Sequence, residues 1–226
     1  MKQDSYQVEE NVKLVVFDMA GTTVDEGGLV YKTLVSTIKS YQIPIEDEEI
    51  KNWYGVNKTQ VLKYFLNRSG QDDTKLTDML SNFKTNLKKN YFEDNQVKLI
   101  HPQLPDLFNN LRNRGIKIGL NSGFSVDIQE ALIERLNLRN CIDCYVSSES
   151  VPHGRPEPYM IQYLMKQCGI TNPKEVVKVG DSINDILEGK NSNCYKSIGV
   201  LSGAETKDKL EEAGADMILD SVMDLC

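Results

Sequence analysis

Three short apolar runs of the sequence end in side chains that could do chemistry. Asp18, Ser122 and Asp181 stand at or just beyond the carboxyl end of such a run. Runs of this kind are typical of buried parallel strands. Ligands of an open parallel sheet bind beyond the carboxyl ends of its strands, so we expect these three side chains to meet at one place.

The residue types at this predicted meeting point favour phosphoryl chemistry. Asp185 follows Asp181 by four residues, a spacing that lets both carboxylates meet across a strand-to-helix turn. Carboxylates without a nearby histidine or thiol suit a hard cation, and Mg²⁺ is the common case. Arg155, in the segment His-Gly-Arg-Pro before another expected helix, adds a guanidinium. A hydroxyl, a guanidinium and backbone N–H groups beside a divalent cation would hold a phosphoryl group.

The elements that must position these residues alternate between strand and helix. The strongest strand predictions are residues 12–17, 116–120 and 176–179, and the weaker ones are 144–146, 197–200 and 217–219. Helices are expected around 157–168, 184–190 and 206–213, and Asp127 with Glu130 three residues later is expected to open another. This alternation predicts an α/β protein with a doubly wound parallel sheet and a Rossmann-like core.

The segment from about residue 29 to residue 97 breaks this alternation. Its apolar residues recur at helical spacing and it contains no convincing strand. We therefore predict a core domain made of residues 1–27 and 99–226, with a small helical cap domain, residues 28–98, inserted after the first strand. The two connections, at Gly27-Gly28 and around residues 100–102, are short enough to act as hinges.

Composition excludes several classes of function. The 226 residues carry a net charge of −7, which argues against binding to nucleic acid. No apolar run is long enough for a signal peptide or a membrane span, and no membrane partner is expected. Five sparse cysteines fit a reducing compartment, so we expect a cytoplasmic location. For the Cys-x-x-Cys pair, Cys141 and Cys144, free thiols are favoured over a redox pair. The oligomeric state, monomer or homodimer, stays open.

Four segments resemble the four motifs of the haloacid dehalogenase superfamily, in the right order. They are Phe-Asp-Met-Ala-Gly-Thr-Thr at 17–23, Asn-Ser-Gly at 121–123, Gly-Arg-Pro at 154–156 and Gly-Asp-Ser-Ile-Asn-Asp at 180–185. The resemblance implies that Asp18 is a nucleophile that forms an aspartyl-phosphate, and that Ser122 and Arg155 hold phosphoryl oxygens. It also implies an Mg²⁺ site whose ligands are Asp18, the backbone carbonyl of Ala20, Asp181 and Asp185.

Ala20 departs from the usual pattern of the superfamily. Its phosphatases and mutases usually carry a second aspartate at this position, which protonates the leaving alkoxide and contributes roughly 10² to 10⁴ in rate. Alanine cannot do this. The stretch Asp-x-Ala-Gly-Thr-Thr-Val-Asp is instead similar to phosphonoacetaldehyde hydrolase, or phosphonatase, and to phosphonatase-like hydrolases. In that family a lysine of the helical insertion condenses with the substrate aldehyde.

Lys58 is the candidate for this lysine. The segment Trp-Tyr-Gly-Val-Asn-Lys-Thr, residues 53–59, is expected to be a loop between helices and is similar to the Gly-x-x-Lys segment of phosphonatase. Cleavage of a carbon–phosphorus bond would expel a carbanion unless an adjacent iminium absorbs the electrons, and a lysine can form that iminium. Shielding by Trp53 or Tyr54 would lower the pKa of Lys58 and supply free amine.

The predicted function is that of a Mg²⁺-dependent hydrolase that cleaves an aldehyde or ketone phosphonate through a Lys58 imine. Its small-molecule partner would be a phosphonate or phosphate, and the expected substrate-binding positions are Ala20, Gly21, Thr22, Gly123, Tyr54 and Gly55.

Departures from the phosphonatase pattern keep two alternatives open. Tyr54 stands where phosphonatase has a methionine, Phe124 stands where it has a tyrosine, and no histidine closely follows Lys58. One alternative is a phosphatase of small phosphorylated metabolites that lacks the usual acid/base aspartate. The other is an inactive binding module on the same fold.

Overall fold

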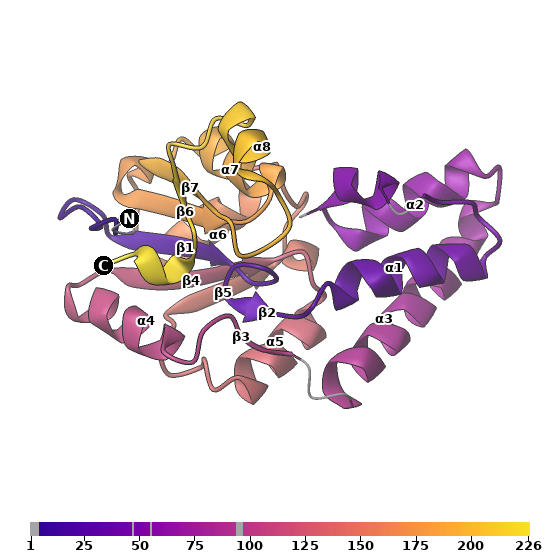
Figure 1. Cartoon of the computed structure of the whole chain (residues 1–226), viewed down its shortest axis with the longest axis horizontal. Coiled ribbons are helices and arrows are strands. Elements are labelled where there is room, and N and C mark those ends of the chain that lie inside the picture. The colour runs from indigo at the N-terminus through magenta and orange to yellow at the C-terminus, as the bar shows by residue number, and fades with distance from the viewer. Residues whose placement is uncertain (1–4, 47, 55, 94–96) are drawn as a thin grey trace.

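The computed structural model describes residues 5–46, 48–54, 56–93 and 97–226, and its centre is a six-stranded parallel sheet flanked by helices (Figure 1). The strand order is β5-β4-β1-β6-β7-β8, and every neighbouring pair runs parallel. The strands are β1 (Leu14–Asp18), β4 (Lys117–Ser122), β5 (Cys144–Ser147), β6 (Val176–Gly180), β7 (Lys196–Val200) and β8 (Met217–Leu219). The predicted α/β fold with a Rossmann-like sheet is therefore confirmed.

Both faces of the sheet are covered, which explains why the strands read as continuous apolar runs. In β1, Val15 and Phe17 pack into one buried cluster with the helix that begins at Leu104, whereas Leu14 and Val16 pack into another with the helix that begins at Tyr159. In the part of the chain that the structure describes, five helices flank the sheet. Their bounds are α4 (Leu104–Asn113), α5 (Val126–Arg135), α6 (Tyr159–Cys168), α7 (Ile183–Asn191) and α8 (Lys207–Glu212).

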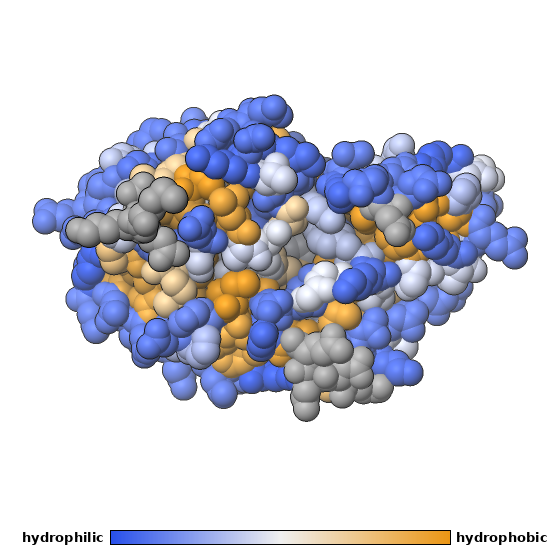
Figure 2. Space-filling view, viewed as in Figure 1, coloured by the Kyte–Doolittle hydropathy of each residue, from blue (hydrophilic) through white to orange (hydrophobic). Residues whose placement is uncertain are grey.

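Three further helices lie beside the carboxyl ends of the central strands (Figure 1). These inserted helices are α1 (Leu29–Ser40), α2 (Lys58–Arg68) and α3 (Leu76–Glu93). Both α1 and α2 pack on α3. The chain segments that lead into and out of them pair as a short antiparallel ladder, β2 (Val24–Asp25) with β3 (Lys98–Leu99). Hydrophilic side chains cover most of the outline of the molecule (Figure 2).

Several features differ from the elements expected from sequence. The β2–β3 ladder was not expected, because two-residue strands carry no periodic signal. The helix α4 was not among the expected elements either, although its buried residues Leu104, Leu107, Phe108 and Leu111 recur at helical spacing. The helix expected to open at Asp127 begins at Val126, and its N-cap is Ser125. Asp127 instead lies in the first turn and pairs with Lys88 of α3. Lys58 is the first residue of α2 and not part of a loop, because the Asn57 side chain caps that helix by accepting from the backbone N–H of Thr59.

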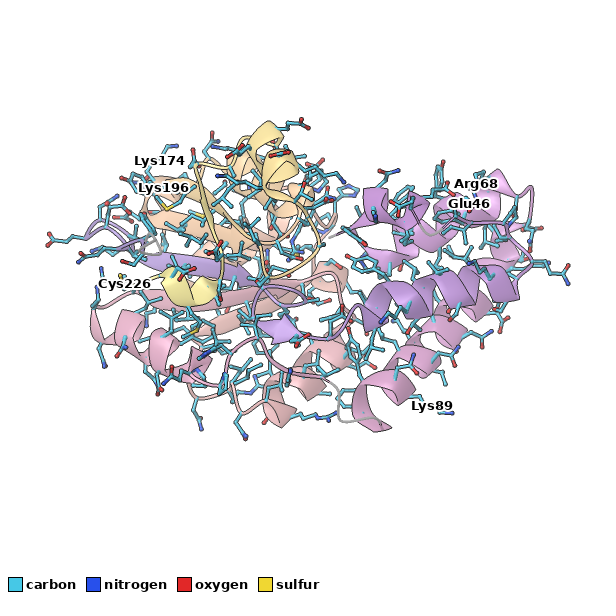
Figure 3. All side chains as sticks on the ribbon, viewed as in Figure 1. Glu46, Arg68, Lys89, Lys174, Lys196 and Cys226 are labelled. Atoms are coloured by element: carbon cyan, nitrogen blue, oxygen red, sulfur yellow. The ribbon has the colours of Figure 1, made fainter. Side chains whose placement is uncertain are left out.

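The first described residues and the last residues of the chain pair at the end of the sheet that faces away from the inserted helices. The Cys226 N–H donates to the carbonyl of Tyr6, at 2.9 Å. Cys226 and Lys196 lie at this end, whereas Arg68 and Glu46 lie at the far end of the inserted helices (Figure 3). Within the described residues, the helices are too short or too polar to cross a membrane.

Candidate active site

Three aspartates gather at the carboxyl edge of the sheet. Asp18 ends β1, Asp181 follows β6 and Asp185 lies in the first turn of α7. All three are buried, and each offers a carboxylate oxygen within 4.8 Å of the other two. The predicted convergence of strand ends therefore exists, and it concentrates negative charge in a small volume.

Arg155 supplies the nearest positive charge. Its Nη2 lies 2.6 Å from Asp18 Oδ1, and its Nε lies 3.1 Å from Asp185 Oδ1. A further hydrogen bond fixes the guanidinium, because Nη2 also donates to the backbone carbonyl of Asn121 at 3.0 Å. A guanidinium with partners on several sides is fixed in direction, so it can present one edge to a phosphoryl oxygen.

A second, deeper layer of charge was not among the residues predicted for the site. Lys178 Nζ lies 2.8 Å from Asp185 Oδ1, and Glu188 Oε2 lies 3.1 Å from Arg155 Nε. The amide of Asn121 donates to both Glu188 oxygens at 3.0 and 2.9 Å. Signals for both residues exist in the sequence: Lys178 interrupts an apolar strand, and Glu188 follows Asp185 by three residues on the same helix face.

The surroundings of Asp181 explain why a glycine stands at position 21 and a threonine at position 22. Gly21 has φ +83°, and a Cβ there would lie 2.3 Å from Asp181 Oδ2. The Thr22 hydroxyl donates to Asp181 Oδ1 at 3.2 Å, and the Ala204 N–H donates to Oδ2 at 2.7 Å. Gly21 and Thr22 were predicted to bind substrate, but the structure places them against Asp181, where they fix the direction of this carboxylate.

The pKa values of the three aspartates report how crowded this site is. Burial, followed by the charges of Asp18 and Asp185, raises the pKa of Asp181 well above its usual value. Burial also raises the pKa of Asp18, and Asp185 adds to that effect although Arg155 opposes it. At Asp185 burial acts in the same direction, but Arg155 and Lys178 outweigh it and lower the pKa.

This donor set fits Mg²⁺. It is made entirely of oxygen atoms, which hard cations prefer. Asp185 Oδ1 lies near Lys178 and Arg155 but accepts no well-directed hydrogen bond from any described residue, which leaves it able to ligate an ion. A divalent cation would also relieve the repulsion that raises the pKa of Asp18 and Asp181.

Magnesium is expected to stabilise the folded protein through these carboxylates. At a concentration 100 times its Kd, Mg²⁺ should raise the Tm by about 5–10 °C. Asp181→Asn should remove this gain, because it deletes a ligand. Without metal, however, the variant should be at least as stable as the natural protein, because it also removes a repelled charge. Thermal unfolding with and without Mg²⁺ checks both signs, and an unchanged metal response in the variant would exclude Asp181 as a ligand.

The aspartates line a small pocket, which we call the site cavity. Its volume is about 20 Å³, room for little more than one water molecule. It is lined by eight of the residues predicted for the site: Asp18, Ala20, Lys58, Ser122, Gly123, Arg155, Asp181 and Asp185. Ser122 is buried at the end of β4, where its Oγ accepts from the Phe124 N–H at 3.1 Å.

A further predicted substrate-binding position, Tyr54, lies outside the site cavity. Tyr54 lines a neighbouring, larger cavity of about 310 Å³ together with Ala20 and Asp181, and does not line the site cavity. Its carbonyl accepts from the Asn184 amide at 2.6 Å. Gly55 lies outside the described residues.

Lys58 reaches the site cavity from the amino end of α2. Its Nζ donates to the carbonyl of Val56 at 2.8 Å and lies 4.7 Å from the centre of the Tyr31 ring. Burial, with a smaller contribution from the charge of Arg155, lowers the pKa of Lys58 to about 8. With such a pKa, about a tenth of the amine is unprotonated at pH 7, far more than for an ordinary lysine.

The aromatic shield of Lys58 differs from the one expected. Trp53 stacks on Tyr64, at 4.6 Å between ring centres. Tyr54 packs against Tyr31, at 4.2 Å. The ring beside the amine is therefore that of Tyr31 in α1. No spacing rule connects Tyr31 to Lys58, because their contact exists only through the packing of two helices.

Glu26 is a second residue that sequence reasoning missed. It is buried where the chain enters the inserted helices, and its Oε2 accepts from the Tyr91 hydroxyl at 3.0 Å and from the Val30 N–H at 2.7 Å. Burial raises the pKa of Glu26. Its charge in turn acts on Lys58 and raises the pKa of that amine, against the effect of burial.

Comparison with known proteins agrees with this geometry. The sequence model of the family described as haloacid dehalogenase-like hydrolase matches residues 15–200. A phosphonoacetaldehyde hydrolase of Lactiplantibacillus plantarum is 28% identical over 255 aligned positions, which cover 95% of this chain and 94% of the relative. A pyrophosphatase PpaX of Oceanobacillus iheyensis is 23% identical over 215 positions, with 95% of both chains covered.

Solved structures share the fold at lower identity. A phosphonoacetaldehyde hydrolase-like protein from Oleispira antarctica has a TM-score of 0.81 at 21% identity, covering 95% of this chain and 90% of its own. A hydrolase from Pseudomonas syringae has a TM-score of 0.82 at 21% identity, covering 94% and 95%. The family match spans most of the chain and includes all four motifs. The chain belongs to the haloacid dehalogenase-like hydrolase family.

Proposed function

We propose that this hydrolase cleaves the carbon–phosphorus bond of a small carbonyl phosphonate. The observation that carries the proposal is the presence of Lys58 in the same cavity as Asp18, Arg155 and the predicted metal ligands. A buried amine with a pKa of about 8 is a suitable nucleophile for a carbonyl group. Asp18 beside a guanidinium is suited to receive a phosphoryl group.

The residues divide the reaction between them. The Lys58 amine condenses with the substrate carbonyl to give an iminium, and water leaves. Asp18 then attacks phosphorus, and the electrons of the breaking carbon–phosphorus bond pass to the iminium and leave an enamine. Arg155 and Ser122 hold the phosphoryl oxygens. Mg²⁺, when bound by the aspartates, neutralises charge on the phosphoryl group. Water finally hydrolyses the aspartyl-phosphate, and protonation and hydrolysis of the enamine free Lys58.

This chemistry accounts for Ala20. The residue lines the site cavity, two positions after Asp18. A phosphate ester needs an acid there to protonate its leaving alkoxide. An enamine leaving group is already neutral, so the position needs no acid. The phosphonoacetaldehyde hydrolases among the relatives support this choice of substrate class.

A phosphatase of small phosphorylated metabolites is the second candidate. The alignment with phosphonoacetaldehyde hydrolase spans 255 positions, more than the 226 residues of this chain, so that relative carries residues without a counterpart here. The alignment with pyrophosphatase spans 215 positions, which is no longer than this chain. Under this alternative Lys58 contacts the substrate without forming an imine.

We further propose that residues 28–98 act as a cap over a core made of residues 1–27 and 99–226. The site cavity is too small for a phosphonate, so the inserted helices must move for a substrate to enter. Polar contacts between the two parts would have to break. Among them are Asn57 Nδ2 with Ser148 Oγ at 2.9 Å, Asn184 Nδ2 with the Tyr54 carbonyl at 2.6 Å, Lys84 Nζ with Glu149 Oε1 at 2.9 Å, and the ion pair of Lys88 with Asp127.

Borohydride trapping tests the imine directly. Protein incubated with phosphonoacetaldehyde and Mg²⁺ should be inactivated by borohydride, and peptide mapping should find the reduced adduct on Lys58. The exposed Lys63 on the same helix serves as the internal control and should stay unlabelled. Recovery of unmodified protein during active turnover would eliminate the imine and leave the phosphatase.

The pH dependence should follow the Lys58 amine. Because only the free amine attacks a carbonyl, kcat/KM for phosphonoacetaldehyde should rise with pH and level off above about 8. Glu26→Gln removes a negative charge that raises the pKa of Lys58, so it should shift this rise to lower pH. A pH–rate profile of both proteins checks the sign. A shift to higher pH would contradict the assignment.

A further inference from the structure

A second small cavity lies directly beside the site cavity. The two share Lys58, Gly123 and Phe124 as wall residues. The far wall of the second cavity is apolar and consists of Leu80, Phe83 and Leu87 from α3 with Ile128 from α5. Its volume is about 20 Å³, enough for one small group.

We propose that this cavity is a subsite for a small apolar substituent on the carbonyl carbon of the substrate. The inference rests on the proposed function, because it takes Lys58 as the residue that meets the carbonyl. Consider a phosphonate whose phosphoryl group lies at Asp18 and whose carbonyl carbon lies at Lys58. The next carbon attached to that carbonyl carbon then lies at the wall that the two cavities share. The apolar lining favours an alkyl group there.

The volume limits the substituent. A group of one or two carbons fits about 20 Å³, whereas a longer chain would have to displace the buried Phe83 or Leu87. The polar rim includes the ion pair of Lys84 with Glu149. The subsite therefore selects ketone phosphonates with a methyl or ethyl group over substrates with larger or charged groups.

Saturated alkylphosphonates test the subsite without requiring imine chemistry. With Mg²⁺ present, propylphosphonate should bind about fourfold more tightly than ethylphosphonate, because one further methylene becomes buried. Leu80→Phe should abolish this gain by filling the subsite, while Leu76→Phe, one turn earlier on α3 and outside both cavities, should preserve it. Phe83→Leu enlarges the space and should move the best chain length upward.

The outcomes separate the subsite from the proposed function. Equal affinities for ethyl- and propylphosphonate in the natural protein, or an unchanged gain in Leu80→Phe, would overturn the subsite even if phosphonoacetaldehyde is cleaved. Failure to cleave phosphonoacetaldehyde would overturn the proposed function, while a chain-length preference in binding would still support the subsite.

A different observation, the contact of two thiols, carries a second inference. Cys144 Sγ in β5 lies 2.8 Å from Cys168 Sγ at the end of α6, and both residues are only partly buried. The Cys-x-x-Cys partner, Cys141, is turned away and approaches the carbonyl of Leu138. The chain between Cys144 and Cys168 carries Arg155.

We infer that Cys144 and Cys168 form a reversible disulfide when the protein meets a peroxide. The Cys168 thiolate attacks one peroxide oxygen and becomes a sulfenic acid as the O–O bond breaks and water forms. The Cys144 thiolate then attacks that sulfur and releases a second water, so two thiols lose two electrons and two protons in total. The hydrogen bond from Cys144 lowers the pKa of Cys168, which favours Cys168 as the attacking thiolate.

Treatment of the full chain with hydrogen peroxide tests this pair. Mass spectrometry should show the loss of two hydrogen atoms and a peptide cross-link between Cys144 and Cys168, reversed by dithiothreitol. The oxidised protein should have a Tm about 5–10 °C higher, because the bond closes a chain loop. Cys168→Ser should abolish both effects and Cys141→Ser neither. A cross-link to another cysteine, or no cross-link, would overturn the inference.

Discussion

Asp18→Asn is expected to lower kcat by about 10⁴-fold or more for phosphonate and phosphate substrates alike. The amide cannot attack phosphorus, so both candidate reactions lose the step they share. The side chain keeps its size. In the natural protein Arg155 Nη2 lies 2.6 Å from Asp18 Oδ1, and the oxygen of the asparagine side chain can still face this guanidinium. Folding should therefore persist, and the loss should appear in kcat with little change in Tm.

The matched control for this variant is Asp143→Asn. Asp143 also flanks a strand, but it precedes β5 and so lies at the amino edge of the sheet, where it pairs with Arg112 and Lys117. Its replacement should change kcat by less than about twofold. Binding of fluoroberyllate, which mimics an aspartyl-phosphate, should occur in the natural protein and in Asp143→Asn only. Activity of Asp18→Asn within tenfold of the natural value would exclude this residue as the nucleophile.

The sheet and the aspartate cluster were predictable because they depend on short-range patterns. Continuous apolar runs mark parallel strands buried on both faces, and Asp18 and Asp181 occur where two such runs end. Chain topology then brings the ends together. Asp185 required only the spacing of a helical turn. For these residues, local pattern and global fold carry the same information.

The surroundings of Lys58 were not predictable in the same way. The Tyr31 ring lies beside this amine and the charge of Glu26 raises its pKa, and both effects come from other segments of the chain and depend on how α1, α2 and α3 pack. A helix has several faces, and hydrophobic spacing identifies only the buried one. The sequence therefore indicated a candidate lysine, whereas its burial and its pKa of about 8 follow from tertiary packing.

Lys58→Arg is expected to separate the two candidate reactions. The variant keeps a positive charge in the cavity, but a guanidinium stays protonated and cannot form an imine. Turnover of phosphonoacetaldehyde should fall by about 10³-fold or more, while turnover of p-nitrophenyl phosphate, whose leaving group needs no acid, should change by less than tenfold. Lys63→Arg, on the exposed side of the same helix, is the matched control and should leave both rates unchanged.

The ratio of these two rates carries the information, because a general disturbance of the cavity would lower both. Arginine is larger than lysine, and Lys58 is only 8% exposed, so Lys58→Met is the second variant, with similar volume and no charge. It too should lose the phosphonate reaction selectively. A parallel loss of both activities in both variants would mean that Lys58 binds the phosphoryl group, and the phosphatase would then be the better account of this site. Selective loss would assign the imine to Lys58, because the two substrates differ in their need for a carbonyl partner.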